Sequence, residues 1–229
     1  MLSKKPSFRP NKSMAEGSDP WFVLIAGVNG SGKSTFAQPG MIAGLLDESD
    51  ASEIDVINPD TETLRIRAER PELSLDDANL LAAKSAERIV RNRIAAKSGH
   101  FAIETVLSTD KYRDIVEEAI RLGWRFLFIY IVIDSVEESI RRVAHRVSFG
   151  GHDVPNDKLR KRWALSRANM PWFWNRATSA FLYWNPPGFG TPTKEAEKHG
   201  ALAVSDGDHL RRPDPSVAEL LENLGIPQF

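Results

Sequence analysis

Residues 27–34 read GVNGSGKS and fit the pattern G-x-x-x-x-G-K-[ST], which binds phosphate groups. Its glycines let backbone N–H groups curl around a polyphosphate, and a helix that begins there adds unpaired N–H groups and a positive dipole end. We expect Lys33 to reach the β- and γ-phosphates of a nucleoside triphosphate and Ser34 to ligate Mg²⁺. The whole phosphate-binding set would be Gly27, Asn29, Gly30, Ser31, Gly32, Lys33, Ser34 and Thr35. The alternative, a Gly/Ser turn that caps an ordinary helix, is disfavoured because a strand is predicted before the motif and a helix after it.

Asp60 ends the segment INPD, directly after a predicted strand. In doubly wound sheets ligands bind at the carboxyl edge, and a carboxylate there can accept the proton of an attacking hydroxyl. The same residue could instead belong to a simple Asn-Pro-Asp turn and cap the next helix. The sequence leaves both interpretations open.

Glu104 and Thr105 follow the apolar residues FAI, where a buried strand should be finishing. Glu104 is therefore expected near the carboxyl edge of the sheet, within reach of substrate hydroxyls or of water on a metal ion. The alternative is a strand-end carboxylate in solvent, with Ser108 or Thr109 capping the following helix.

Arginines gather in the segment RRVAHRVSFGGHDVPNDKLRKRW, residues 141–163. Arg142 and Arg146 lie four residues apart and share a helix face, and Arg160 and Arg162 fall on the return helix. Arginines on a closing lid can stabilise a transferring phosphoryl group while they expel water, and the pair Gly150-Gly151 would let the loop move. A solvated arginine face on two amphipathic helices is the plainer alternative.

Strand and helix patterns alternate along the chain, beginning with the apolar run Trp21–Gly27, which is typical of a strand buried on both faces. This alternation predicts an α/β fold of the P-loop NTPase type, with a doubly wound, mostly parallel sheet of five to six strands and a helical lid at about 146–163. Further strands are expected at Glu53–Ile57, His100–Val106, Arg125–Ile133, Ala180–Trp184 and, at the edge, Ala201–Ser205. Helices are expected from about Gly32 with a break at Pro39-Gly40, over Leu75–Ser98 with its end at Gly99, at Asn156–Thr178 and at Pro215–Gly225.

The composition is that of an ordinary soluble globular protein. The chain has 229 residues and a formal charge of -1, which favours neither nucleic acid nor an anionic membrane as a partner. It contains no cysteine, which excludes disulfides and fits a reducing cytoplasm. No apolar stretch is long enough to span a bilayer. Residues 1–20 are expected to be a disordered tail and 21–229 a single kinase domain.

Four segments together resemble the zeta toxin family, especially its stand-alone bacterial branch of P-loop kinases. They are GVNGSGKST, NPD, FAIETVLST and RVAHRVSFGGHDVP followed by RKRW, and the likeness covers about Phe22 to Tyr183. The resemblance implies ATP and Mg²⁺ as cofactors, Asp60 as general base, and Glu104 and Thr105 facing the substrate. It also implies that Arg146 and Arg162 clamp the transferring phosphoryl group, with Arg142 beside the ATP.

The resemblance further implies a substrate and a candidate partner. Several members of the family phosphorylate the 3′-hydroxyl of the amino sugar in UDP-N-acetylglucosamine, and an antitoxin protein is the candidate partner. Asn185 alone remains of an Asp-Asn-Ser that the family often carries after its fifth strand. Two rival hypotheses stay open: a kinase of another nucleotide or sugar, and an ATP-binding regulatory module without turnover. No guanine-reading Asn-Lys-x-Asp follows the P-loop and no LSGGQ-like signature is present, so a GTPase and a transporter ATPase are disfavoured.

Overall fold

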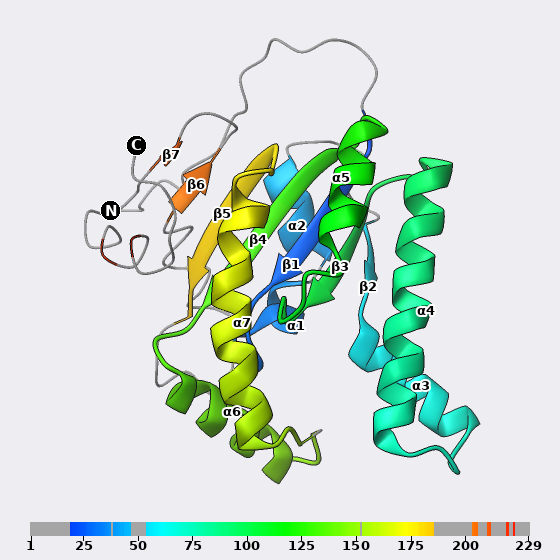
Figure 1. Ribbon diagram of the computed structural model, residues 1–229, viewed down its shortest axis with the longest axis vertical. Coiled ribbons are helices and arrows are strands. Elements are labelled where there is room, and N and C mark those ends of the chain that lie inside the picture. The colour runs from blue at the N-terminus through cyan, green and yellow to red at the C-terminus, as the bar shows by residue number, and fades with distance from the viewer. Residues whose placement is uncertain are drawn as a thin grey trace.

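The described strands of this protein belong to a single β-sheet. The computed structural model describes residues 19–37, 39–46, 54–151, 153–185, 203–205 and 210–211, together with Glu219 and Glu222. Their strands form one seven-stranded sheet of order β2-β3-β1-β4-β5-β6-β7 (Figure 1). The first five in this order pair in parallel, and β6 and β7 are antiparallel additions at one edge. The strands are β1 Trp21–Ala26, β2 Asp55–Ile57, β3 Phe101–Thr105, β4 Arg125–Val132, β5 Ser179–Trp184, β6 Ala203–Ser205 and β7 Leu210–Arg211.

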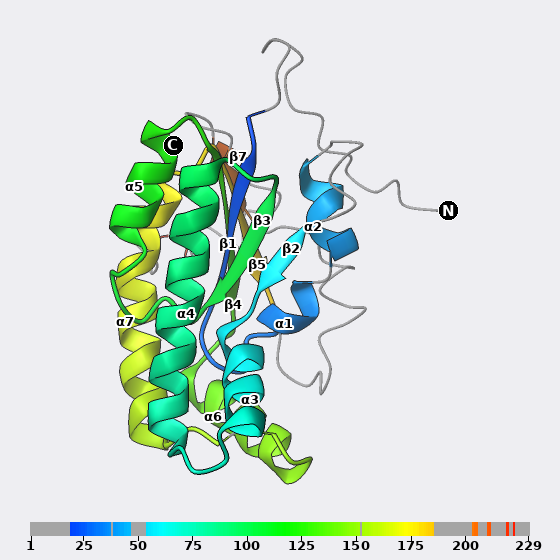
Figure 2. The ribbon, with the colours of Figure 1, turned by 90° about the vertical axis from the view of Figure 1, so that its right-hand side faces the viewer.

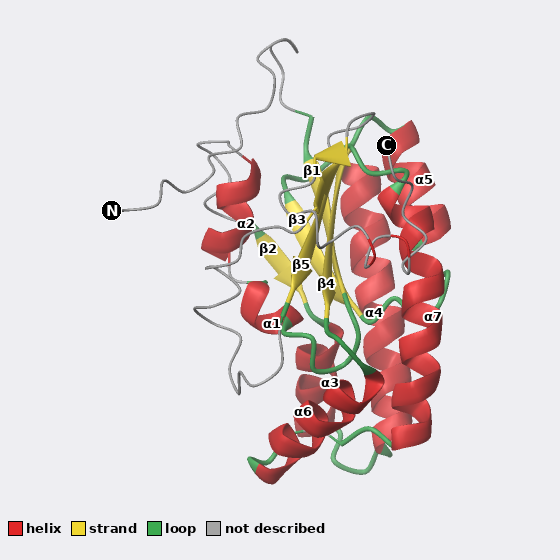
Figure 3. Cartoon of the chain, turned by 90° about the vertical axis from the view of Figure 1, so that its left-hand side faces the viewer, coloured by secondary structure: helices red, strands yellow, loops and turns green. Residues whose placement is uncertain are grey.

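Helices cover both faces of the sheet. Figures 2 and 3 show α4, α5 and α7 packed along one face and α1 and α2 on the other. The remaining helices, α3 and α6, lie past the carboxyl ends of the strands. The helices are α1 Lys33–Phe36, α2 Pro39–Leu46, α3 Pro59–Glu69, α4 Leu75–Ala96, α5 Arg113–Arg121, α6 Val136–Ser148 and α7 Asn156–Trp174.

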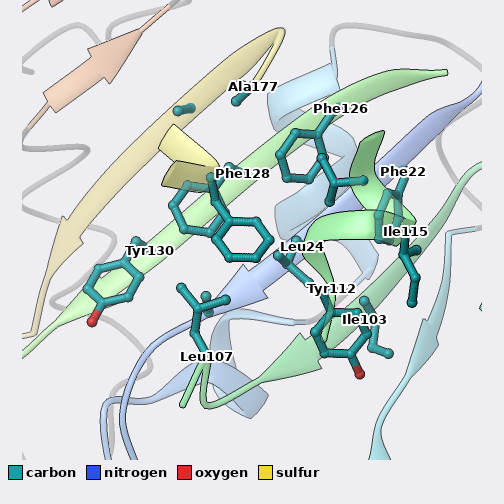
Figure 4. Close-up of a cluster of buried hydrophobic side chains, with 14 of the residues drawn as sticks. Phe22, Leu24, Ile103, Leu107, Tyr112, Ile115, Phe126, Phe128, Tyr130 and Ala177 are labelled. Carbon is teal, nitrogen blue, oxygen red and sulfur yellow. The ribbon is translucent and has the colours of Figure 1, made fainter. Parts of the chain in front are cut away.

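The central strands bury side chains alternately on the two faces, as the period of a strand requires. From β1, Phe22 and Leu24 enter the core under α4, α5 and α7, whereas Val23 and Ile25 enter the core under α1 and α2. The larger core is aromatic, and Figure 4 shows rings from β1 and β4 gathered there. Two cores on one sheet explain why these strands read as unbroken apolar runs.

The structure confirms the long helix α4 and corrects its end. The Ser74 hydroxyl accepts a hydrogen bond from the Asp77 backbone N–H (3.1 Å), so Ser74 is the N-cap. The helix ends at Lys97, which adopts the left-handed conformation (φ 46°), and not at Gly99 as predicted. Along this helix Ala78, Ala82, Ala86, Val90 and Ile94 are buried, whereas Ile89 is 37% exposed.

The order of strands places the phosphate-binding motif at the switch point of the sheet. Strand β1 lies between β3 and β4, so the chain leaves its carboxyl end where the neighbouring connections run in opposite directions. Helix α1 lasts one turn, and the chain starts again at Pro39, since a proline is tolerated at the first position of a helix but not inside it. The predicted break is therefore confirmed.

The predicted fold class is confirmed, and the short strand β7 goes beyond the predicted five to six strands. Among the described residues, no helix is both long and apolar enough to cross a membrane. Predictions for two segments fall outside the described residues: the tail, except for Asp19 and Pro20, and the last helix, apart from Glu219 and Glu222.

Candidate active site

One cavity of about 990 Å³ lies at the carboxyl edge of the sheet. We call residues 27–34 the P-loop. The P-loop end of the cavity is made by Asn29, Gly30, Gly32, Lys33, Ser34 and Thr35, with Arg142, Arg146 and Arg162. The α4 end is made by Thr63, Asp76, Asn79, Ala83, Ser108, Thr109 and Lys111. Asp60, Glu104 and Thr105 also line the cavity. In Figure 1, α6 and α3 flank this region on opposite sides of α1.

The P-loop folds as the sequence predicts. Gly27 has φ +149°, and a Cβ there would lie 2.5 Å from the Ile131 carbonyl oxygen, so this turn requires glycine. Gly32 is the N-cap of α1, and the Lys33 ammonium donates to the Val28 carbonyl (2.9 Å) across the loop. Burial lowers the pKa of Lys33 to about 8, although the carboxylates of Glu104 and Asp60 act against that shift.

Side chains from α6 and from the end of β5 hold the P-loop from outside. The Ser139 hydroxyl donates to the Asn29 carbonyl (2.7 Å), and the Asn185 amide donates to the Ser31 carbonyl (2.9 Å). The Arg142 guanidinium donates to the Gly30 carbonyl (3.3 Å) and to the Asn185 carbonyl (3.1 Å), and it pairs with Glu138 on its own helix. The carbonyls of Asn29, Gly30 and Ser31 are therefore fixed by side chains outside the loop. The backbone N–H groups of the loop are then available to bind a ligand.

Glu104 connects the P-loop to the end of β2. It is only 6% exposed, so the alternative of a carboxylate in solvent is wrong. It accepts hydrogen bonds from the Ser34 hydroxyl (2.8 Å) and from the Asn58 amide (2.8 Å). Burial raises the pKa of Glu104, while these two bonds and nearby Lys33 act to lower it. A hydroxyl beside a carboxylate is the set of hard oxygen ligands that Mg²⁺ prefers, so Ser34 and Glu104 could hold that ion.

Asn58, not Asp60, caps α3. The Asn58 side chain accepts from the backbone N–H groups of Asp60 (2.8 Å) and Thr61 (3.4 Å), and Pro59 occupies the first helical position. The predicted alternative, in which Asp60 is the cap, is therefore wrong. The Asp60 carboxylate is exposed in the first turn of α3 and lines the cavity. Hydrogen bonds thus run from Ser34 through Glu104 and Asn58 to the Asp60 backbone.

The lid segment brings two of its arginines to the cavity. Arg146 lies on α6, and the Arg162 guanidinium donates to the Asn29 side-chain oxygen (3.2 Å). Arg160 is directed elsewhere and pairs with Glu137 (2.8 Å) on the outer side. Gly151 packs against Arg146, because a Cβ at Gly151 would lie 2.5 Å from the Arg146 Cγ. Val143, Val154 and Leu159 form a small core that joins the two lid helices.

The predicted site residues lie at this edge of the sheet, but the sequence does not predict their contacts. Asn58 was interpreted only as part of a turn, although the order Asn-Pro-Asp is also that of a capped helix start. Thr105 accepts from the Leu107 N–H (3.0 Å), and Leu107 is buried with φ 60°. Thr63 and Asn79 belong to no motif, because they enter the cavity only through the packing of α3 on α4, and Lys111 enters it from the segment between β3 and α5. His145 on α6 lies against Phe149, and His152 is outside the described residues.

Comparisons with known proteins bear on the fold of the chain. No family model matches the chain. A protein of Haemophilus influenzae described as uncharacterized is 28% identical over 141 residues, which are 62% of this chain and 91% of that protein. A chain of the AvrRxo1-ORF1:AvrRxo1-ORF2 complex, crystallised with sulphate ions, superposes with a TM-score of 0.63 at 16% identity, over 93% of this chain and 66% of that one. The complex has also been solved with ATP.

A second solved structure is similar at nearly full length. It belongs to the PezAT chromosomal toxin–antitoxin system of Streptococcus pneumoniae, with a TM-score of 0.58 at 15% identity, over 95% of this chain and 82% of that one. At these identities the likeness is one of fold. The chain spans about two thirds of the AvrRxo1 chain that it matches. The α/β fold that the sequence predicts is confirmed.

Proposed function

We propose that this protein is an ATP-dependent kinase that phosphorylates a hydroxyl group of a small molecule. The observation that carries the proposal is the meeting of the P-loop, the Asp60 carboxylate and two lid arginines in one cavity. A protein that only binds ATP needs no carboxylate beside the position of the terminal phosphate. The hydrogen-bonded path from Ser34 to the Asp60 backbone fixes the spacing between the P-loop and the start of α3, where that carboxylate lies.

Each group has a distinct role in the proposed reaction. The acceptor hydroxyl loses its proton to the Asp60 carboxylate as its oxygen bonds to the γ-phosphorus of ATP. The bond from that phosphorus to the β–γ bridging oxygen breaks, and ADP leaves. Lys33, Arg146 and Arg162 balance the charge of the phosphoryl group in transit, and Arg142 serves the ATP site through the loop that it supports. Bound Mg²⁺, held by Ser34 and Glu104, would neutralise charge on the phosphates.

The finer proposal concerns the acceptor. We infer the 3′-hydroxyl of the amino sugar in UDP-N-acetylglucosamine, which Asp60 would deprotonate while Glu104 and Thr105 face the sugar. The sequence resemblance to zeta toxins supports this choice, and so does a cavity large enough for two ligands. An antitoxin protein is the proposed partner, because the PezAT structure is named as that of a toxin–antitoxin system and the AvrRxo1 structure as that of AvrRxo1-ORF1 with AvrRxo1-ORF2.

The test is a direct assay for phosphorylated product. The protein is incubated with ATP, Mg²⁺ and a panel of nucleotide sugars, free sugars and nucleosides, and products are identified by mass spectrometry. We expect product from UDP-N-acetylglucosamine and none from Lys33→Ala, whose ATP binding is lost. If only another panel member gave a phosphorylated product, the proposed acceptor would be wrong and the proposed kinase activity would stand. Intact ATP binding without any product would favour the regulatory module.

A further inference from the structure

The chain between β3 and α5 carries several residues of the cavity wall, and we call residues 105–111 the acceptor segment. Leu107, inside this segment, has a left-handed backbone conformation (φ 60°), which is unfavourable for a residue with a bulky side chain. It is only 1% exposed, and Figure 4 shows it within the cluster of buried side chains. The surrounding structure must therefore hold this part of the backbone in place.

A side chain of α7 holds the Leu107 backbone. The Asn169 amide donates a hydrogen bond to the Leu107 carbonyl (3.0 Å), and the Leu107 N–H donates to the Thr105 hydroxyl (3.0 Å). The Asn169 side-chain oxygen accepts from the guanidinium of Arg113 (2.8 Å), the first residue of α5. Asn169 thus links the acceptor segment to the start of the helix that follows it.

Arg113 is held in an unfavourable position by α7. A positive charge in the first turn of a helix opposes the helix dipole. The Arg113 Nε is buried and has no hydrogen-bond partner among the described residues. Its guanidinium contacts Asn169 and lies 5.4 Å from the centre of the Trp172 ring, and both of these residues belong to α7. The start of α5 and the acceptor segment are therefore attached to the same helix.

The same face of α7 also reaches the P-loop. Arg162, Ser166 and Asn169 follow the i, i+4, i+7 spacing of one helix face. Arg162 donates to the Asn29 side-chain oxygen (3.2 Å). Between these two contacts, the buried Ser166 hydroxyl shares a hydrogen bond with the Tyr130 hydroxyl of β4 (2.9 Å). Seven residues of helix span about 10 Å, so α7 sets the distance between the contact with the P-loop and the contact with the acceptor segment.

We propose that Asn169 is a positioning residue, which holds the acceptor segment at a fixed distance from Arg162 and so aligns the acceptor with the phosphoryl group. Asn169 does not line the cavity, so it acts through Leu107. Alignment of the reacting groups contributes strongly to the rate of such a transfer. The inference rests on the proposed function for the acceptor, whereas the link between α7 and the acceptor segment exists without it.

Hydrogen exchange, read by mass spectrometry on the full chain, tests the link without any turnover. Asn169→Asp can still accept from Arg113, but it cannot donate to the Leu107 carbonyl and would repel it. We expect the acceptor segment to exchange about tenfold faster or more, while β1 and the P-loop exchange as in the wild type. Equal exchange of the segment in both proteins would overturn the inference, and so would faster exchange over the whole sheet.

The matched control is Asn175→Asp, which makes the same change at the exposed end of α7. Its acceptor segment should exchange like that of the wild type, and an equal acceleration in both variants would contradict the link. A cooperative thermal transition shows that each variant is folded. If Asn169→Asp does not fold, Asn169→Ala removes both hydrogen bonds without adding a charge, and the same comparison then decides.

Turnover separates this inference from the proposed function. In Asn169→Asp, kcat/KM for UDP-N-acetylglucosamine should fall about tenfold or more, while the KM for ATP stays unchanged. A residue that served stability alone would leave both values unchanged in the folded variant, and this result would contradict the positioning role while leaving the kinase intact. If the wild type phosphorylates no acceptor, the proposed function fails, and hydrogen exchange still decides on the link.

Discussion

The two ends of the cavity are built in different ways. At the P-loop end, the carbonyls of Asn29, Gly30 and Ser31 each receive a side-chain donor from α6 or from the end of β5. At the α4 end, fewer side chains are held within the part of the chain that the structure describes: Thr63 hydrogen-bonds to Asn79 (3.1 Å) and to the Pro59 carbonyl (3.0 Å), and Asp76 forms an exposed pair with Lys158 (3.8 Å). The groups at the P-loop end are therefore held in place without a ligand, whereas those at the α4 end are held by fewer contacts.

This difference corresponds to what each end would bind. A triphosphate is the same in every catalytic cycle, so groups that are held in place can bind it without the cost of ordering them. The α4 end offers polar side chains whose arrangement depends on helix packing, which suits an acceptor that defines specificity. We therefore expect mutations at the P-loop end to reduce stability and ATP binding together, and mutations at the α4 end to affect the acceptor alone.

The largest effect on stability should come from Arg142→Ala. Its loss would leave the buried Glu138 with one partner fewer and would remove a donor from the Gly30 and Asn185 carbonyls. We expect a loss of about 2–3 kcal/mol in the free energy of unfolding, measured with urea, together with weaker ATP binding. Arg141→Ala is the matched control, because Arg141 pairs with the same Glu138 but is 55% exposed. It should lose less than about 1 kcal/mol. Equal losses in the two variants would contradict the bracing of the P-loop.

Asn58→Asp should separate the cap of α3 from the link to Glu104. Aspartate caps a helix about as well as asparagine, but it cannot donate to the Glu104 carboxylate and would repel it. We expect turnover to fall about tenfold, together with a lower thermal midpoint, because the buried Glu104 loses a donor and faces a like charge. Asn92→Asp adds the same charge on the exposed side of α4 and should match the wild type. Unchanged turnover in Asn58→Asp would remove this link from the account.

The pKa of Lys33 predicts how ATP binding depends on pH. The free protein should lose the Lys33 proton as pH rises through about 8, well below the ordinary value of 10.5, whereas bound triphosphate requires the charged form. ATP affinity should therefore decrease above pH 8, by at most about tenfold per pH unit. The free energy of unfolding of the ligand-free protein should rise as the pH increases from 8 to 10.5. In that range the unfolded chain still holds the Lys33 proton and the folded protein does not. Calorimetry at pH 7.5 and 9.5 checks this, and Lys33→Arg should show neither trend.

Much of the fold could be predicted because apolar runs and capping residues are local signals. The run at β1, the Ser74 cap of α4 and the glycines of the P-loop each mark one element within a few residues. The end of α4 was misplaced because Lys97 adopts a conformation that favours glycine, and nothing in its neighbourhood signals that.

The site was predictable in its residues but not in its contacts. Position after a strand was enough to place Asp60 and Glu104 at the carboxyl edge of the sheet. That Glu104 joins Ser34 to Asn58 depends on the parallel register of β1, β2 and β3, which links residues far apart in the chain. Arg142 and Arg146 looked equivalent on one helix face, yet Arg142 lies against the P-loop backbone and Arg146 is exposed in the cavity. Only three-dimensional packing separates them.

The kinetic behaviour of Asp60→Asn tests the central claim most directly. Asn58 is the cap of α3, so this replacement keeps the helix start and the shape of the side chain while it removes the ability to accept a proton. We predict that ATP and acceptor binding stay nearly intact, whereas turnover falls on the order of a hundredfold or more. Turnover within a few-fold of the wild type would contradict the account, because Asp60 would then be a residue of the cavity wall and not the base.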